Sequence, residues 1–229
     1  MTREVYHATT PEVHQRLKNI LRPIYSALAR TTVRGLENFP PSGPALMVTN
    51  HLSLFDPPAI FITMPRQGIV FVTTKHQRNP LIAAILRAAG CIWVERGEAD
   101  RAALKAGLDV LKEGFVLGIA PEGTRSPTHA LQKGKTGAAY LATRASAPIL
   151  PVVVWGVEEI KNTARQLRRA QATVSYGRVF HLPDDARAKG EALEAYTTEI
   201  MCHLAALLPE KYRGYYADHP RVQKLISEQ

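Results

Sequence analysis

The sequence predicts an α/β fold in which a mixed, largely parallel sheet is flanked by helices and preceded by an N-terminal amphipathic helical segment. Short apolar runs of strand length recur along the chain, and segments with the apolar spacing of helices fall between them. The 229 residues, of which 45% are hydrophobic, suffice for one domain with a sizeable core. We therefore expect an N-terminal helical segment over residues 1–32 and a main domain over residues 33–229.

The N-terminal segment is amphipathic and basic. Its apolar residues recur at helical spacing, with basic residues among them: Val13, Leu17, Ile20, Leu21, Ile24 and Leu28, and Arg16, Lys18, Arg22 and Arg30. Pro23 predicts a kink or a break in this helix. Two interpretations are open, because such a helix either lies in the headgroup layer of an anionic membrane or packs on the core of its own domain.

The remaining elements alternate along the chain. The runs expected to form strands are residues 45–48, 69–72, 91–94, 115–119, 149–155 and 173–180. The helices expected between them are residues 56–64, 79–89, 99–112 and 134–145. Gly90, Gly114 and Gly156 follow these stretches where helix C-caps or turns are expected. Strands that alternate with helices favour parallel pairing.

The C-terminal segment combines aromatic and basic residues. They are Tyr212, Arg213, Tyr215, Tyr216, Arg221 and Lys224. This composition is typical of a patch at a membrane interface, and it also fits a solvated tail.

Composition restricts the class of partner. The net charge of +9 favours acidic partners such as anionic lipid or phosphorylated molecules, and no recognisable nucleic-acid-binding module accompanies it. The two cysteines, Cys91 and Cys202, are too few for a disulfide framework or a Cys-rich metal site, and they favour a reducing compartment. We find no signal peptide and no run of eighteen apolar residues, so we expect a protein that is neither exported nor membrane-spanning.

His51 and Asp56 follow the apolar run that ends at Val48, where a strand should give way to a loop. A histidine is the natural general base near neutral pH, and a carboxylate on its far ring nitrogen fixes the tautomer. On a regular helix residues with this spacing do not share a face, so the dyad needs a bend or a helix start between them, which Pro57 suits. The alternative is that Asp56 is only the N-cap of a helix.

A second polar block also follows an apolar run. It spans residues 118–126, which include Glu122, Gly123, Thr124 and Arg125, and it follows the apolar run of residues 115–117. Two strand exits that both carry charged groups suggest one shared cleft.

Further blocks complete a recognisable order along residues 33–157. They are residues 91–97, which end in Arg96 and Gly97, the apolar residues 148–152, and the basic residues Lys75 and Lys133. Together with the first two blocks they resemble the glycerolipid acyltransferases, which transfer a fatty acyl chain to glycerol 3-phosphate or its monoacylated derivative. The likeness is greatest to the bacterial 1-acylglycerol-3-phosphate acyltransferases.

The resemblance implies a role for each block. His51 held by Asp56 is the general base that draws the proton from the acceptor hydroxyl, without an acyl-enzyme. Arg96 contacts the acceptor phosphate, with Arg125 as second choice, although either residue also suits a surface ion pair. Glu122 contacts an acceptor hydroxyl in this resemblance, while a carboxylate could also hold a neighbouring arginine in place. The remaining substrate-binding candidates are Gly123, Thr124 and Lys75.

The expected partners follow from the same resemblance. They are an acyl-CoA or acyl carrier protein donor, a lysophospholipid acceptor and the anionic membrane surface, reached peripherally or monotopically from the cytoplasmic face. No cofactor, metal or nucleic acid is expected. The alternatives are an acyltransferase for another lysolipid or for a lipid hydroxyl or amine, and a non-catalytic lipid-binding protein at the membrane surface.

Overall fold

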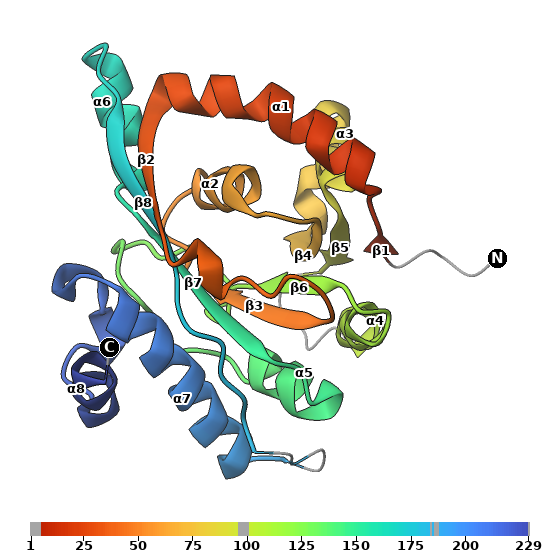
Figure 1. The fold of residues 1–229 in the computed structure, drawn as a ribbon, viewed down its shortest axis with the longest axis vertical. Helices are drawn as coiled ribbons and strands as arrows, with labels where there is room; N and C mark the ends of the chain where they lie inside the picture. The colour runs from red at the N-terminus through yellow and green to blue at the C-terminus, as the bar shows by residue number, and fades with distance from the viewer. Residues whose placement is uncertain (1–5, 96–100, 184, 186–187, 229) are drawn as a thin grey trace.

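The computed structural model describes residues 6–95, 101–183, 185 and 188–228 (Figure 1). Its strands form one eight-stranded sheet in the order β1-β5-β4-β6-β3-β7-β8-β2. Five neighbouring pairs, from β5 across to β7 and β8 with β2, are parallel, whereas β1 with β5 and β7 with β8 are antiparallel. The predicted mixed, largely parallel sheet is confirmed.

Six strands lie close to their predicted positions, and two edge strands, at residues 6–7 and 29–34, were not predicted. They are β1 (Tyr6–His7), β2 (Ala29–Arg34), β3 (Ala45–Thr49), β4 (Gly68–Thr73), β5 (Cys91–Val94), β6 (Val116–Ile119), β7 (Ile149–Trp155) and β8 (Ala170–Tyr176). Strand β8 begins and ends earlier than predicted, and Phe180 forms only an isolated bridge with Ile149. Strand β2 was not predicted, because at the edge of the sheet only Ala29 of its residues is buried and no apolar run marks it.

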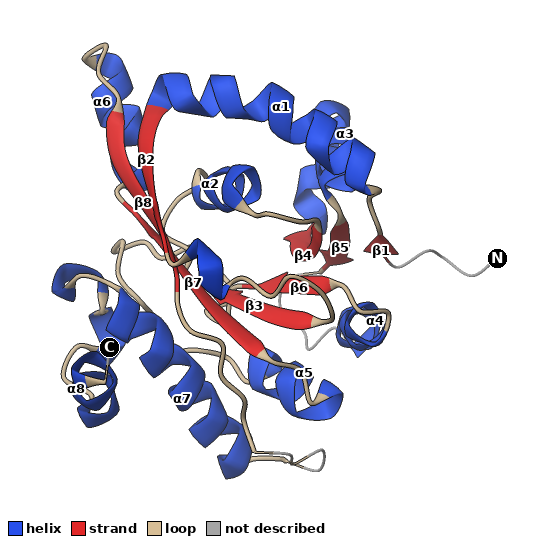
Figure 2. Cartoon of the chain, in the orientation of Figure 1, coloured by secondary structure: helices blue, strands red, loops and turns tan. Residues whose placement is uncertain are grey.

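Helices cover both faces of the sheet (Figure 2). They are α1 (Pro11–Leu28), α2 (Asp56–Thr63), α3 (Pro80–Ala89), α4 (Arg101–Lys112), α5 (Gly137–Ala145), α6 (Ile160–Arg165), α7 (Glu191–Leu207) and α8 (Pro220–Ser227). One core cluster packs α4, α5, α7 and α8 against one face, and a second packs α1, α2 and the start of α6 against the other. In the part of the chain that the structure describes, no helix combines the length and the apolar character needed to cross a bilayer.

Helix α1 runs unbroken through Pro23, so the predicted break does not occur. Its buried residues are His14, Lys18 and Tyr25. Lys18 Nζ donates to the carbonyl of Met64, beyond the end of α2, so α1 packs on the domain through a partly polar face. The helix passes directly into β2, which pairs with β8 along its whole length, and the expected boundary at residues 32 and 33 therefore falls inside a strand.

The C-terminal segment folds onto the core. Tyr212 and Tyr216 are 4% and 2% exposed, and only Tyr215, at 66%, faces solvent. The expectation of an interfacial aromatic patch or a solvated tail is therefore wrong for Tyr212 and Tyr216, because their rings complete the core formed by α7 and α8.

Candidate active site

Five parallel strands end at one edge of the sheet, in the spatial order β5, β4, β6, β3 and β7. The predicted site residues follow four of these strands. His51 follows β3, the Glu122 block follows β6, and Lys75 lies in the short helix η2 (Thr74–Arg78) after β4. Arg96 follows β5 but lies outside the described residues. Ligands of open α/β sheets bind at this edge, so the topology gathers the candidates where a site is expected.

His51 and Asp56 form a hydrogen-bonded pair. His51 Nδ1 lies 2.9 Å from Asp56 Oδ2, which also accepts the backbone N–H of Ser53 at 2.7 Å. The Asp56 side chain is 2% exposed and the His51 side chain 26%. Burial raises the pKa of Asp56, while these bonds and the nearby histidine oppose that rise.

The pair leaves one ring nitrogen available. With ionised Asp56 accepting at Nδ1, the proton of neutral His51 resides there, and Nε2 carries the lone pair. No described residue forms a hydrogen bond to Nε2. A partly exposed imidazole with an unengaged nitrogen and a buried carboxylate behind it is the arrangement of a general base.

The start of α2 brings the two side chains together. The chain turns at Leu54 and Phe55, and α2 begins at Asp56 with Pro57 in its first turn. The predicted helix start between the partners is therefore confirmed. Phe55, not Asp56, occupies the N-cap position, so the alternative of a purely capping aspartate does not hold.

The second block clamps the backbone of His51. Glu122 Oε1 accepts the His51 N–H at 2.9 Å, and the Ser126 N–H donates to the His51 carbonyl at 2.8 Å. Glu122 Oε2 accepts the N–H of Gln132 at 2.9 Å. The prediction that the two blocks meet is confirmed.

Glu122 is 2% exposed, and burial raises its pKa to about 7. Because both of its oxygens accept backbone N–H groups, it holds the loops around His51 in place. The expected contact with an acceptor hydroxyl or a neighbouring arginine stays a prediction.

The other members of the second block differ in exposure. Gly123 adopts a φ of 68°, and its N–H donates to the Ala120 carbonyl at 3.0 Å, so in this conformation that group is engaged within the turn. Thr124 is half-buried and Arg125 is exposed. No described residue pairs with the guanidinium of Arg125 or the ammonium of Lys75, so both cations are available to a ligand.

Three site features were missed from sequence. The buried amide of Asn50 bonds both the N–H and the carbonyl of Val154, each at 2.8 Å, and so fixes the end of β3 to β7. His129 Nδ1 lies 3.1 Å from the Leu52 carbonyl, next to His51. The Lys135 side chain packs over Gly123, where an added Cβ would lie 3.1 Å from its Nζ. Of these three residues, only Asn50 could have been noticed in the sequence, because it is a polar residue between the apolar strand and His51.

Comparisons with known proteins identify the family of this chain. A family model described as Acyltransferase matches residues 30–155, which include His51, Asp56 and Glu122. The chain is 29% identical over 144 residues to the 1-acyl-sn-glycerol-3-phosphate acyltransferase of Borreliella burgdorferi, covering 61% of this chain and 57% of that protein. It is also 29% identical over 128 residues to human 1-acyl-sn-glycerol-3-phosphate acyltransferase alpha, covering 55% of this chain and 45% of the relative. The chain thus spans about half the length of these curated relatives.

A solved structure shares the fold. The crystal structure of the 1-acyl-sn-glycerophosphate (LPA) acyltransferase PlsC from Thermotoga maritima aligns with a TM-score of 0.66. The alignment covers 82% of this chain and 76% of the other, with 22% sequence identity.

Proposed function

Since the chain belongs to the Acyltransferase family, we propose that it transfers a fatty acyl chain from a thioester donor to the free hydroxyl of a lysophospholipid. The acceptor in this proposal is 1-acylglycerol 3-phosphate and the product is phosphatidic acid, in keeping with the names of the relatives. The observation that carries the proposal is the 2.9 Å bond from His51 to a buried Asp56, which leaves His51 Nε2 unengaged.

The reaction proceeds by direct transfer. His51 Nε2 takes the proton of the acceptor hydroxyl as its oxygen attacks the thioester carbonyl, and the Asp56 carboxylate stabilises the imidazolium that forms. The tetrahedral intermediate then collapses, the carbon–sulfur bond breaks, and the imidazolium returns its proton to the departing thiolate. The products are an ester and a free thiol. We do not propose Ser53 as a nucleophile, because no described base forms a hydrogen bond to its Oγ, which accepts the Phe55 N–H at 3.3 Å within the turn.

The acceptor phosphate has cations available along the same edge. Arg125 follows β6, next to the strand that carries His51, and Lys75 follows β4, one strand further along. We propose that these residues, with Arg96, hold the phosphate so that the hydroxyl lies near His51. A guanidinium suits this task because it grips two phosphate oxygens at once.

The membrane surface is the proposed location of the acceptor. Val13, Ile20 and Ile24 of α1 are 39%, 61% and 59% exposed, and Leu81 of the neighbouring helix α3 is 69% exposed (Figure 1). Exposed basic residues lie on the same two helices: Arg16, Arg22 and Arg87. This combination suits peripheral or monotopic contact with an anionic bilayer, which we place at its cytoplasmic face because Cys91 and Cys202 are free thiols.

His51→Ala tests the reaction. We expect kcat with acyl-CoA and lysophosphatidic acid to fall by about 10²- to 10⁴-fold while the melting temperature is retained. His181→Ala, at an exposed histidine away from this edge, is the matched control and should keep wild-type turnover. Mass spectrometry of the products from a panel of lysolipids and both donor types identifies the acceptor and the donor. Wild-type turnover in the His51→Ala enzyme would exclude the mechanism.

A further inference from the structure

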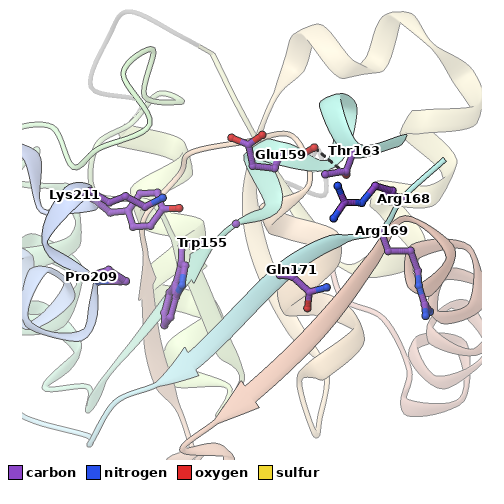
Figure 3. A pocket seen from close by; sticks show the side chains of 10 residues that line it. Trp155, Glu159, Thr163, Arg168, Arg169, Gln171, Pro209 and Lys211 are labelled. Atoms are coloured by element: carbon purple, nitrogen blue, oxygen red, sulfur yellow. Dashed lines mark hydrogen bonds between the residues drawn. The ribbon is translucent and has the colours of Figure 1, made fainter. Parts of the chain in front are cut away.

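A cavity of about 410 Å³ opens on the β7 side of the active site (Figure 3). Its walls come from the end of β7, the η3 (Val157–Glu159) and α6 segment, the start of β8, and η4 (Glu210–Tyr212). None of its lining residues belongs to the His51–Asp56 dyad or to the loops that clamp it. The cavity is therefore a separate feature of the same sheet edge.

Two sets of hydrogen bonds join this cavity to the active site. Trp155, in its wall, directly follows Val154, whose backbone is bonded by Asn50, the residue before His51. On the other side, Leu131 precedes Gln132, whose N–H donates to Glu122. The Leu131 N–H donates to the carbonyl of Tyr212, another lining residue, and the Leu131 carbonyl accepts the N–H of Tyr215. Along the edge, His51 thus lies between the cavity on β7 and the cations that follow β6 and β4.

The charges in the cavity suit an anion. Three cations line it, Arg168, Arg169 and Lys211, against one carboxylate, that of Glu159. The guanidinium of Arg168 is directed toward the cavity in Figure 3, and no described residue pairs with it. Arg169 is turned away and lies 3.3 Å from the Ser26 carbonyl, so it belongs to the rim.

Two aromatic residues, Trp155 and Tyr212, line the same cavity. Lys211 Nζ lies 4.6 Å from the centre of the Tyr212 ring, and Trp155 lies below Glu159, between Lys211 and Gln171 in Figure 3. A flat ring for stacking together with cations on opposite walls is the combination that a phosphorylated nucleotide requires. A lysophospholipid head group has one phosphate and no aromatic ring, so it would make fewer of these contacts.

We propose that this cavity binds the phosphorylated nucleotide of an acyl-CoA donor, with the adenine against Trp155 and phosphates between Arg168 and Lys211. The volume of the cavity falls within the range of about 300–1,000 Å³ that is usual for small-molecule sites. The proposal rests on the proposed acyl transfer and adds the identity of the donor. In this arrangement donor and acceptor approach His51 from opposite sides, so the thioester and the hydroxyl meet at its ring.

Binding alone tests the site, without turnover. The chain has two tryptophans, so a Trp93→Phe protein reports only Trp155. We expect adenosine 3′,5′-bisphosphate and CoA to quench this fluorescence in a saturable way. Adding Arg168→Gln and Lys211→Gln should raise the Kd about tenfold or more, because each removes a charge-assisted contact to phosphate. Arg165→Gln, which removes the same charge from α6 outside the cavity, is the matched control and should leave the Kd unchanged.

Kinetics supply a second readout. In Arg168→Gln we expect the KM for acyl-CoA to rise about tenfold while the KM for lysophosphatidic acid stays at its wild-type value, since one charged contact contributes about that factor. Three results would overturn the proposal: CoA binds with no change at Trp155, the double variant keeps the wild-type Kd, or glycerol 3-phosphate displaces the nucleotide as a lipid head would. The proposal is also contradicted if this protein takes its acyl chain from acyl carrier protein and does not bind CoA.

Failure of this site and failure of the proposed function are separable. Loss of CoA binding in the double variant, together with full activity of His51→Ala, would support the cavity and reject the mechanism. Unchanged CoA binding, together with an inactive His51→Ala enzyme, would reject the cavity and support the mechanism.

Discussion

At the scale of single residues, the geometry of the candidate site depends on backbone groups as much as on the side chains of His51 and Asp56. The His51 N–H and carbonyl are both bonded by the second block, and Asp56 is positioned by the Ser53 N–H. The imidazole therefore sits on a main chain that has little freedom to move. Such preorganisation suits the proposed role of Nε2 as the acceptor of the hydroxyl proton.

Asp56→Asn tests the tautomer. The asparagine amide can donate to Nδ1 and so favours a ring with its proton on Nε2, where it cannot accept from the hydroxyl. We expect kcat to fall by up to about 10⁴-fold with little change in the KM for either substrate. Steady-state kinetics at neutral pH measure this. Retention of wild-type kcat would show that Asp56 does not set the protonation of His51.

Glu122 predicts a pH dependence of stability. Burial raises its pKa from 4.5 to about 7, so between these values the folded chain binds a proton more readily than the unfolded chain. Its contribution is fully present below 4.5 and is lost as the pH rises through about 7. We expect the unfolding free energy of the wild type to fall relative to Glu122→Gln by about 3 kcal/mol across this window.

Denaturant unfolding of both proteins at several pH values checks this prediction. In Glu122→Gln an amide N–H₂ also faces one of the two backbone donors, which lowers stability at every pH. The test is therefore whether the difference in unfolding free energy between the two proteins varies with pH. A difference that does not vary with pH would contradict the raised pKa of Glu122.

At the scale of elements, the end of β3 is fixed to β7 by Asn50. In Asn50→Ala the N–H and carbonyl of Val154 both lose their buried partner, so we expect a loss of about 2–4 kcal/mol of unfolding free energy. Thr49→Ala is the neighbouring control, because its hydroxyl bonds only the Asn50 carbonyl at 3.2 Å. Urea unfolding measures both. Equal unfolding free energies of the two variants would show that the Asn50 side chain does not stabilise the attachment of β3 to β7.

The central elements were predictable from sequence because burial on both faces leaves an unbroken apolar run. Strand β7, which packs against α2 on one face and α7 on the other, matches its predicted bounds, and so does β5. Strand β2 was not predictable in this way, since five of its six residues lie outside the core. Helix α7 was also missed. Its buried residues include the consecutive positions Ile200, Met201 and Cys202, which hide the helical period.

The site was predictable to a similar degree. The strand exits that carry His51 and Glu122 could be found, because charged residues directly after apolar runs stand out. The partners of Glu122 could not be read from sequence, because Gln132 is brought to it by a loop and its donor is a backbone N–H. The same holds for the cavity beside β7, where residues from β7, β8 and η4 meet only in the folded chain.

At the scale of the whole molecule, α1 and α3 present the exposed apolar side chains proposed to contact a bilayer. We expect the double variant Ile20→Glu and Ile24→Glu to bind anionic vesicles at least about tenfold more weakly, because each substitution removes an apolar side chain from the interface. Tyr215→Glu is the control, since this residue is 66% exposed but belongs to the C-terminal segment. Vesicle sedimentation measures binding. Equal binding of the double variant and the Tyr215→Glu protein would show that α1 does not contact the bilayer.

The passage of α1 into β2 without an intervening residue bears on the proposed contact of α1 with the bilayer. With α1 on the bilayer as proposed, its direct passage into a paired strand restricts rotation of the helix against the sheet, so His51 and Asp56 would keep one tilt over the surface. The distance between the bilayer surface and the imidazole, which the proposed acceptor must cross, would then be set by the fold. Three glycines inserted between Leu28 and Ala29 should therefore slow acylation on vesicles and spare acylation of a short-chain acceptor dissolved as monomers.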